Sequence, residues 1–156
     1  GTFSGGEKIS MRAIIQRVSR TDVVIGGKTV AEIEDGLLVL LGVFEGDVPA
    51  DADFLAKKIA AMRIFCDADD KMNLSVLDIG GSVIAVSNFT LCAAASHGNR
   101  PSFIAAARPE TAEPLYERFV QKLIENGVKN VQTGVFGADM KVGIENDGPV
   151  TIILDS

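Results

Sequence analysis

The chain has 156 residues, of which 47% are hydrophobic, and it carries a formal net charge of -6 with a sequence pI near 4.8. This length fits one domain with a sizeable core, and the composition excludes a disordered chain. The acidic balance argues against a protein that tracks along a nucleic-acid backbone, which needs many Lys and Arg contacts, but it leaves contact with the tip of a nucleic acid open.

The longest wholly apolar run, residues 37–41, is far shorter than the roughly 20 residues that a membrane helix needs. Residues 1–10 lack the pattern of a signal peptide, so we expect them to be a disordered extension or an expression remnant, with the domain spanning 11–156. Cys66 and Cys92 have no CxxC or Cys/His spacing, which predicts neither a disulfide nor a zinc site and suits the cytoplasm.

The first half of the domain predicts strands followed by a helix. A β-rich run from residue 11, the pair Gly26-Gly27 and a second alternating run predict a hairpin, and the apolar residues 36–44 predict a buried strand. Residues 46–65 then change to a helical composition, followed by a short strand over 63–66. The helix is expected to bury one face, formed by Phe54, Leu55, Ile59 and Met62.

The second half begins with a core strand within residues 82–91, after a double glycine, and continues as a long irregular loop over 92–108. A second helix starts near Pro109, buries Ala112, Leu115, Phe119 and Leu123, and stops at Asn126-Gly127. Three short strands are expected near 131–136, 140–145 and 150–154. The sum predicts an α+β fold, with a mostly antiparallel, curled or barrel-like sheet and two main helices in a single domain.

The residues exclude several familiar active sites. His97 is the only histidine and lies in a Ser/Gly/Asn loop, where a solvated surface side chain is the simplest interpretation. No carboxylate cluster accompanies it, so we expect no metal, and no GxSxG elbow or Walker-type loop is present. Any catalysis must therefore use hydroxyls, amides and backbone groups.

Two stretches offer such groups. SNFTL, residues 87–91, ends an apolar strand with two hydroxyls and an amide where the long loop begins, although Ser87 and Thr90 could simply face solvent at a sheet rim. NDGPVT, residues 146–151, is typical of a hairpin turn joining the last two strands. Its Gly-Pro peptide bond could also be cis, because X-Pro bonds are cis in about 5–6% of cases, and a cis bond usually has a structural or functional role.

Seven motifs together resemble one family. MRAIIQRV, GLLVLLGV, KMNLSVLDIGGSVIAVSNFTL, RPSF, AEPLYERFV, FGADM and NDGPVT occur in the order and at the spacings of the D-aminoacyl-tRNA deacylases, and the resemblance covers essentially all of residues 11–156. It implies hydrolysis of the ester between a D-amino acid and the 3′-terminal ribose of tRNA, with achiral glycyl-tRNA as a further expected substrate. It also implies a cytoplasmic homodimer with active sites at the subunit interface and no metal or organic cofactor.

The resemblance assigns catalytic positions to Ser87, Asn88, Phe89 and Thr90. Thr90 is either a nucleophile or a neighbour of backbone donors, near Phe89 and Thr90, that polarise the ester while water attacks with help from the terminal 2′-hydroxyl. We favour the second mechanism, because a threonine needs an adjacent base and neither motif supplies one. Asn88 stands where the family has glutamine, which shortens the side chain by one methylene.

The same resemblance assigns substrate-binding positions. Gly148-Pro149 is expected to be cis and to enter the partner's pocket, where its carbonyl oxygens exclude an L-substituent. Arg17 would fix this segment, or it is an ordinary surface arginine. Ala112 would offer a backbone N–H to the terminal nucleotide, and Met140 would line the pocket, although a core role fits Met140 equally.

Two other functions stay open at this point. One is a related deacylase that acts on small L-aminoacyl-tRNAs such as L-alanyl-tRNA, and the complete NDGPVT with Arg17 favours the D-selective enzyme over it. The other is a non-enzymatic dimeric tRNA-binding or ligand-binding module, for which the changed residue Asn88 is the only support.

Overall fold

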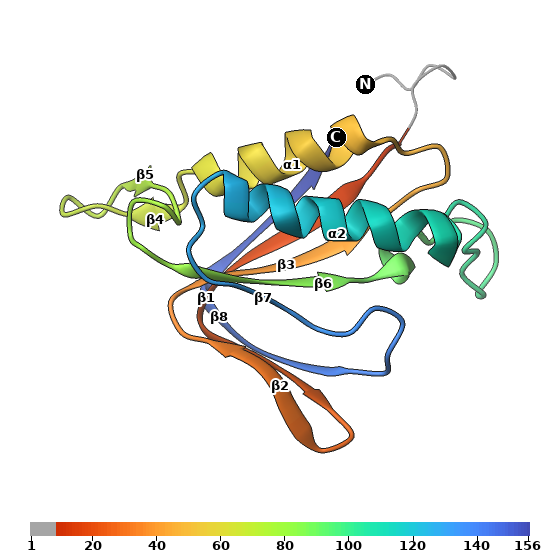
Figure 1. Ribbon diagram of the computed structural model, residues 1–156, viewed down its shortest axis with the longest axis horizontal. Coiled ribbons are helices and arrows are strands. Elements are labelled where there is room, and N and C mark those ends of the chain that lie inside the picture. The colour runs from red at the N-terminus through yellow and green to blue at the C-terminus, as the bar shows by residue number, and fades with distance from the viewer. Residues whose placement is uncertain (1–8) are drawn as a thin grey trace.

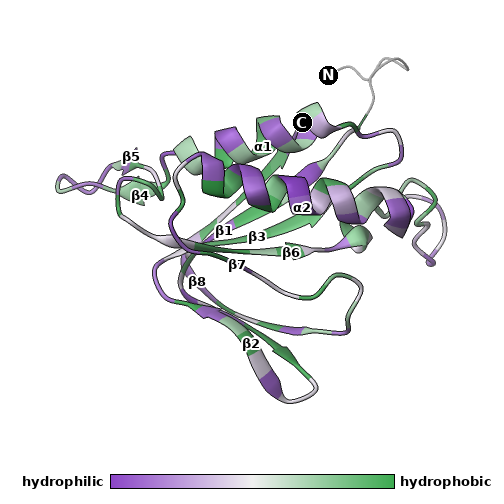
Figure 2. Ribbon diagram, in the orientation of Figure 1, coloured by the Kyte–Doolittle hydropathy of each residue, from purple (hydrophilic) through white to green (hydrophobic). Residues whose placement is uncertain are grey.

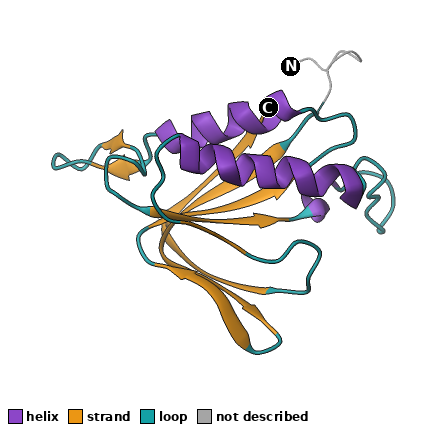
Figure 3. Cartoon of the chain, viewed as in Figure 1, coloured by secondary structure: helices purple, strands orange, loops and turns teal. Residues whose placement is uncertain are grey.

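The computed structural model describes residues 9–156, and Figure 1 shows two layers, a pair of helices lying across one face of a curled sheet. The helices are α1 (Pro49–Ala61) and α2 (Pro109–Glu125), and η1 (Phe89–Cys92) is a short 3₁₀ helix. Figure 3 shows that the strands form the second layer and that a small hairpin, β4 with β5, projects from the side. The strands are β1 (Arg12–Ile25), β2 (Lys28–Ile33), β3 (Gly36–Gly42), β4 (Phe65–Cys66), β5 (Met72–Leu74), β6 (Ser82–Ser87), β7 (Val131–Thr133) and β8 (Lys141–Asp155).

The long strand β1 is the spine of the sheet. It pairs antiparallel with β2, β3 and β8, and the predicted turn at Gly26-Gly27 joins it to β2 with positive φ at both glycines. β6 adds to β3 and β7 adds to β6 in parallel, so the sheet is mixed. At the far side the N–H of Glu32 on β2 donates to Gln132 Oε1 on β7 at 2.8 Å, which brings the sheet close to a closed barrel. The α+β fold with a barrel-like sheet and two helices is confirmed.

The core has two parts, one under the helices and one inside the curl of the sheet. α1 and α2 turn apolar residues onto β1, β3 and β6, and Figure 2 shows the polar side of both helices facing outward. The second cluster fills the curled half around Val18, Leu38 and Ile84. α2 buries the predicted face, but the prediction for α1 was partly wrong, because Phe54 is 47% exposed. The buried face of α1 is instead the narrow, alanine-rich stripe Ala52, Leu55, Ala56, Ile59 and Ala60.

The predicted hairpin turn at NDGPVT is wrong. Residues 140–145 and 150–154 do not form two strands joined by a turn, but belong to the single strand β8. β1 continues along both ends of β8, which keeps the two halves in one ladder in spite of the Gly-Pro step. NDGPVT therefore forms an irregularity within one strand and does not join two strands.

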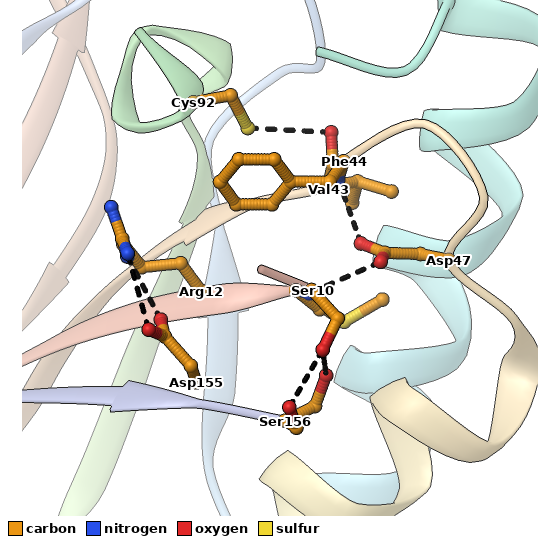
Figure 4. Close-up of polar contacts among 9 residues, drawn as sticks. Ser10, Arg12, Val43, Phe44, Asp47, Cys92, Asp155 and Ser156 are labelled. Carbon is orange, nitrogen blue, oxygen red and sulfur yellow. Dashed lines mark hydrogen bonds and ion pairs between the residues drawn. The ribbon is translucent and has the colours of Figure 1, made fainter. Parts of the chain in front are cut away.

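The start of β1 and the end of β8 lie together beside α1, and an aspartate fixes the neighbouring loop (Figure 4). Ser10, which the sequence places in the extension, donates to the C-terminal Ser156 backbone oxygen at 2.6 Å. The buried carboxylate of Asp47 accepts from the N–H groups of Met11 at 3.1 Å and Phe44 at 2.7 Å. The loop after β3 is thus tied to the start of β1.

The single tyrosine provides a test of the packing between α2 and the sheet. Tyr116 is buried, its hydroxyl donates to Ala85 O at 2.6 Å, and burial raises its pKa to about 12. Burial raises the pKa only in the folded state, so the contribution of the neutral phenol to stability is present below pH 10 and is lost as the pH rises toward 12. We expect absorbance at 295 nm to show no phenolate at pH 10.5, whereas urea-unfolded protein ionises near pH 10. Half-ionisation at pH 10 in folded protein would contradict the burial.

Candidate active site

A cleft of about 810 Å³ opens where the ends of β3 and β6 meet the start of α2 and the segment before β8. Its walls are mostly apolar, as is usual for sites that bind organic ligands. Six of the nine residues predicted for the site line this cleft: Ser87, Asn88, Phe89, Thr90, Ala112 and Met140. The structure therefore brings these six predicted residues together at one cleft.

The polar rim of the cleft is a capped turn rather than the predicted end of a strand. β6 stops at Ser87, and Asn88 begins η1. Asn88 Oδ1 accepts from the Thr90 N–H at 3.2 Å and also accepts a short hydrogen bond from the Thr90 hydroxyl. An asparagine side chain has the right length for this local ring, which competes with continued strand pairing.

This turn leaves one backbone donor uncommitted. The Thr90 N–H is occupied by Asn88, whereas within residues 9–156 no acceptor faces the N–H of Phe89. The Phe89 ring is exposed and meets the Phe103 ring edge-on, with 5.3 Å between the ring centroids. Phe89 thus presents a free N–H and an aromatic surface at the cleft.

The two remaining predicted cleft residues, Met140 and Ala112, come from other elements, the segment before β8 and the first turn of α2. Met140 packs over Gly134, where an added Cβ would lie 2.5 Å from the sulfur, so Gly134 makes the room that Met140 occupies. Ala112 lines the cleft, but its N–H donates to Arg108 O at 2.8 Å in the first turn of α2. The free N–H predicted for Ala112 is therefore wrong, because helix formation uses that donor.

The remaining predicted residues, Arg17, Gly148 and Pro149, lie together outside this cleft. Between the pairs Gln16↔Thr151 and Val18↔Asn146, residues 147–150 of β8 stand opposite Arg17 alone. They form a wide bulge, in which the Gly148-Pro149 bond is cis. Its tip, residues 147–149, is exposed.

Arg17 holds this bulge against the sheet, as the resemblance implies. Its Nε donates to Asp147 O at 3.2 Å and lies 3.5 Å from Asp147 Oδ2, while its Nη1 donates to Ile64 O at 2.7 Å. The Arg17 side chain is only 12% exposed, so it is not an ordinary surface arginine. The planar guanidinium bridges two backbone segments at once.

The sequence missed much of the apolar wall and one charged group. Leu40, Val86 and Phe136 line the cleft, and for the first two the only signal was their place in apolar strands. Among the described residues, Asp139 in the FGADM motif is the only ionisable side chain that lines the cleft, and it is exposed. Among residues 9–156 no group of His, Cys, Asp and Glu is arranged to hold a metal, and no helix there is long and apolar enough to cross a bilayer.

These features define a class of protein: a small α+β protein with a curled mixed sheet and an apolar cleft. The polar groups at the rim of this cleft are a hydroxyl, an amide and a free backbone N–H. Comparison with known proteins gives the family. The family model described as D-Tyr-tRNA(Tyr) deacylase matches residues 14–155, and the chain belongs to this family.

Individual relatives agree with this assignment. The chain is 58% identical to a D-aminoacyl-tRNA deacylase of Geotalea uraniireducens over 94% of each chain. It is 54% identical to the D-aminoacyl-tRNA deacylase of Flavobacterium johnsoniae, over 94% of this chain and 97% of that one. A solved structure titled c-Myc DNA Unwinding Element Binding Protein is similar in fold, with a TM-score of 0.88 and 38% identity over 93% of this chain and 98% of the other.

Proposed function

We propose that this protein hydrolyses the ester bond of D-aminoacyl-tRNA, releasing the free D-amino acid and the tRNA, in the cytoplasm where aminoacyl-tRNA is used. The family and its named relatives support the reaction class. The observation that carries the proposal is the uncommitted Phe89 N–H at the rim of an apolar cleft. Such a donor can stabilise the oxyanion that forms when water attacks an ester.

In this proposal the residues of the turn at the cleft have different chemical roles. The Phe89 N–H polarises the ester carbonyl and binds the oxyanion of the tetrahedral intermediate. Thr90 donates its hydroxyl hydrogen to Asn88, so the lone pairs of its oxygen remain able to accept a hydrogen bond from the substrate or the attacking water. The 2′-hydroxyl of the terminal ribose assists the water, and the 3′-oxygen leaves with a proton as the C–O bond breaks.

The selectivity for D-substrates is assigned to the bulge of a second protomer. Gly148 and Pro149 are exposed and do not line the cleft of their own chain, and they follow Asp147, whose backbone oxygen accepts from Arg17. In the proposed homodimer they enter the partner's cleft, and their backbone carbonyls occupy the space that an L-side chain would need. Exclusion of this kind accepts many D-side chains and also achiral glycine.

The proposal is tested by the loss of ester from four substrates. Purified protein at catalytic concentration is incubated with D-Tyr-tRNA, L-Tyr-tRNA, Gly-tRNA and L-Ala-tRNA. We expect fast loss of the D-ester, slower loss of the glycyl ester and retention of L-Tyr. No loss of the D-ester would overturn the proposal and leave a tRNA-binding or ligand-binding module, whereas rapid loss of L-Ala would indicate the deacylase for small L-residues.

The substitution Thr90→Ala separates the two mechanisms. Because the backbone donor belongs to Phe89, we expect kcat for the D-ester to fall by less than about tenfold, a loss on the scale of one hydrogen bond. The Asn88 amide keeps the Thr90 N–H as its cap partner in this variant. Single-turnover hydrolysis gives the rate, and a loss of more than a thousandfold would point to Thr90 as a nucleophile.

A further inference from the structure

Asn146 lies at the base of the exposed bulge and uses its whole side-chain amide there. Its Nδ2 donates to Arg17 O on β1 at 2.9 Å and to Val150 O at 3.0 Å. Its Oδ1 accepts from the Thr151 hydroxyl at 3.3 Å. The half-buried side chain therefore joins both ends of the bulge to the neighbouring strand.

These bonds stand where the ladder between β1 and β8 is interrupted. Regular pairing with β8 stops at Gln16↔Thr151 and resumes at Val18↔Asn146, so Arg17 has no paired residue on β8. Carbonyl groups at such a break need other donors. The two N–H groups of Asn146 supply them, and the planar amide fixes how far apart the ends of the bulge are.

Two side chains thus hold the bulge from different sides. Arg17 binds its first residue through Asp147 O, and Asn146 binds its last residue through Val150 O. Gly148 and Pro149 lie between these anchors, and neither Arg17 nor Asn146 binds them directly. They are the residues to which the proposed function assigns selectivity. With both ends fixed, the carbonyls between them have a defined position.

We propose that Asn146 is a positioning residue for stereochemical selectivity, setting the place of the Gly148-Pro149 segment without touching the substrate. This inference rests on the proposed function. In this role Asn146 sets the distance between the two ends of the bulge. That distance determines how much space is left for a substituent at the α-carbon of the substrate. A loosened bulge tolerates an L-side chain, so loss of the clamp lowers discrimination rather than simply lowering activity.

The substitution Asn146→Asp tests this role, because the side chain keeps its shape while the two N–H donors are lost. At pH 8 the carboxylate faces two carbonyls, and we expect the ratio of D-Tyr-tRNA to L-Tyr-tRNA hydrolysis rates to fall at least tenfold. Protonation at pH 5.5 restores one donor, so part of the ratio should return there. The wild-type ratio should change little between these pH values.

Asn126→Asp is the matched control. Asn126 is also half-buried and donates from Nδ2 to a backbone carbonyl, Lys122 O at 2.7 Å, but at the end of α2. This variant should lose stability without losing discrimination. Thr151→Val is a milder second test, in which the Asn146 amide loses one partner and we expect a drop in the ratio of about threefold, on the scale of a weak neutral hydrogen bond.

The outcomes separate the inference from the proposed function. Failure of the wild-type protein to hydrolyse the D-ester rejects the proposed function and this role with it. An active wild type with an unchanged D/L ratio in folded Asn146→Asp rejects the positioning role alone, as does an equal loss in Asn126→Asp. If circular dichroism shows Asn146→Asp to be unfolded, the ratio in Thr151→Val decides.

Discussion

Gly148→Ala should lower the rate of D-ester hydrolysis by about 100-fold while the protein stays folded. Gly148 has φ of +127°, and an added Cβ would lie 2.9 Å from Val150 Cγ2 and 3.1 Å from Arg17 Nη2. The backbone conformation costs about 1–3 kcal/mol for a non-glycine residue. The bulge must therefore shift where, in the proposed dimer, it enters the partner's cleft, and a displacement of about 1 Å at a reaction site can cost on the order of 100-fold in rate.

The measurement is single-turnover hydrolysis of D-Tyr-tRNA, with thermal melting to confirm the fold. Gly80→Ala is the matched control, since Gly80 also has positive φ, +64°, but an added Cβ would meet nothing within 4 Å. It should lose stability and keep its rate. A Gly148→Ala enzyme within threefold of wild type would show that the position of the bulge does not matter for the reaction.

Local chemistry explains which elements the sequence could predict. Gly26-Gly27 and Asn126-Gly127 end their elements because the neighbouring backbone needs positive φ or a helix stop, and short-range residue preferences report this. The continuation of β8 through Gly148-Pro149 depends on β1, which is distant in sequence. A turn-forming sequence therefore became a bulge, and a prediction from local preferences chose the turn.

The site shows the same division. Ser87 to Thr90 could be singled out because their hydroxyls and amide follow one another in the chain, and the family resemblance then assigned them to the site. The occupation of the Thr90 N–H by Asn88 is an Asx-type turn that the Asn-x-Thr spacing could have indicated. The opposite wall, with Phe136 and Met140, required the three-dimensional arrangement, because a methionine in an apolar pattern predicts a core position and a cleft position equally.

Asp47→Ala should give the largest loss of stability, about 4 kcal/mol. It removes the acceptor of two buried backbone N–H groups, those of Met11 and Phe44. A buried donor without a partner costs about 1–3 kcal/mol, and these two donors lie on different segments that the carboxylate joins. For a domain of this size the loss corresponds to a fall in melting temperature of about 10 °C.

The consequence extends to the cleft, because Val43, which lines it, immediately precedes Phe44. Urea unfolding measures the loss, with all variants at one protein concentration because the apparent stability of an oligomer depends on concentration. Asp53→Ala is the control: Asp53 is paired with Arg118 at 2.7 Å, but both side chains are exposed, so its removal should cost less than about 1 kcal/mol. Equal losses in the two variants would mean that Asp47 acts only as another surface charge. A large loss in Asp47→Ala alone would show that the buried carboxylate holds the loop after β3 in place. The shape of the cleft would then depend on this carboxylate.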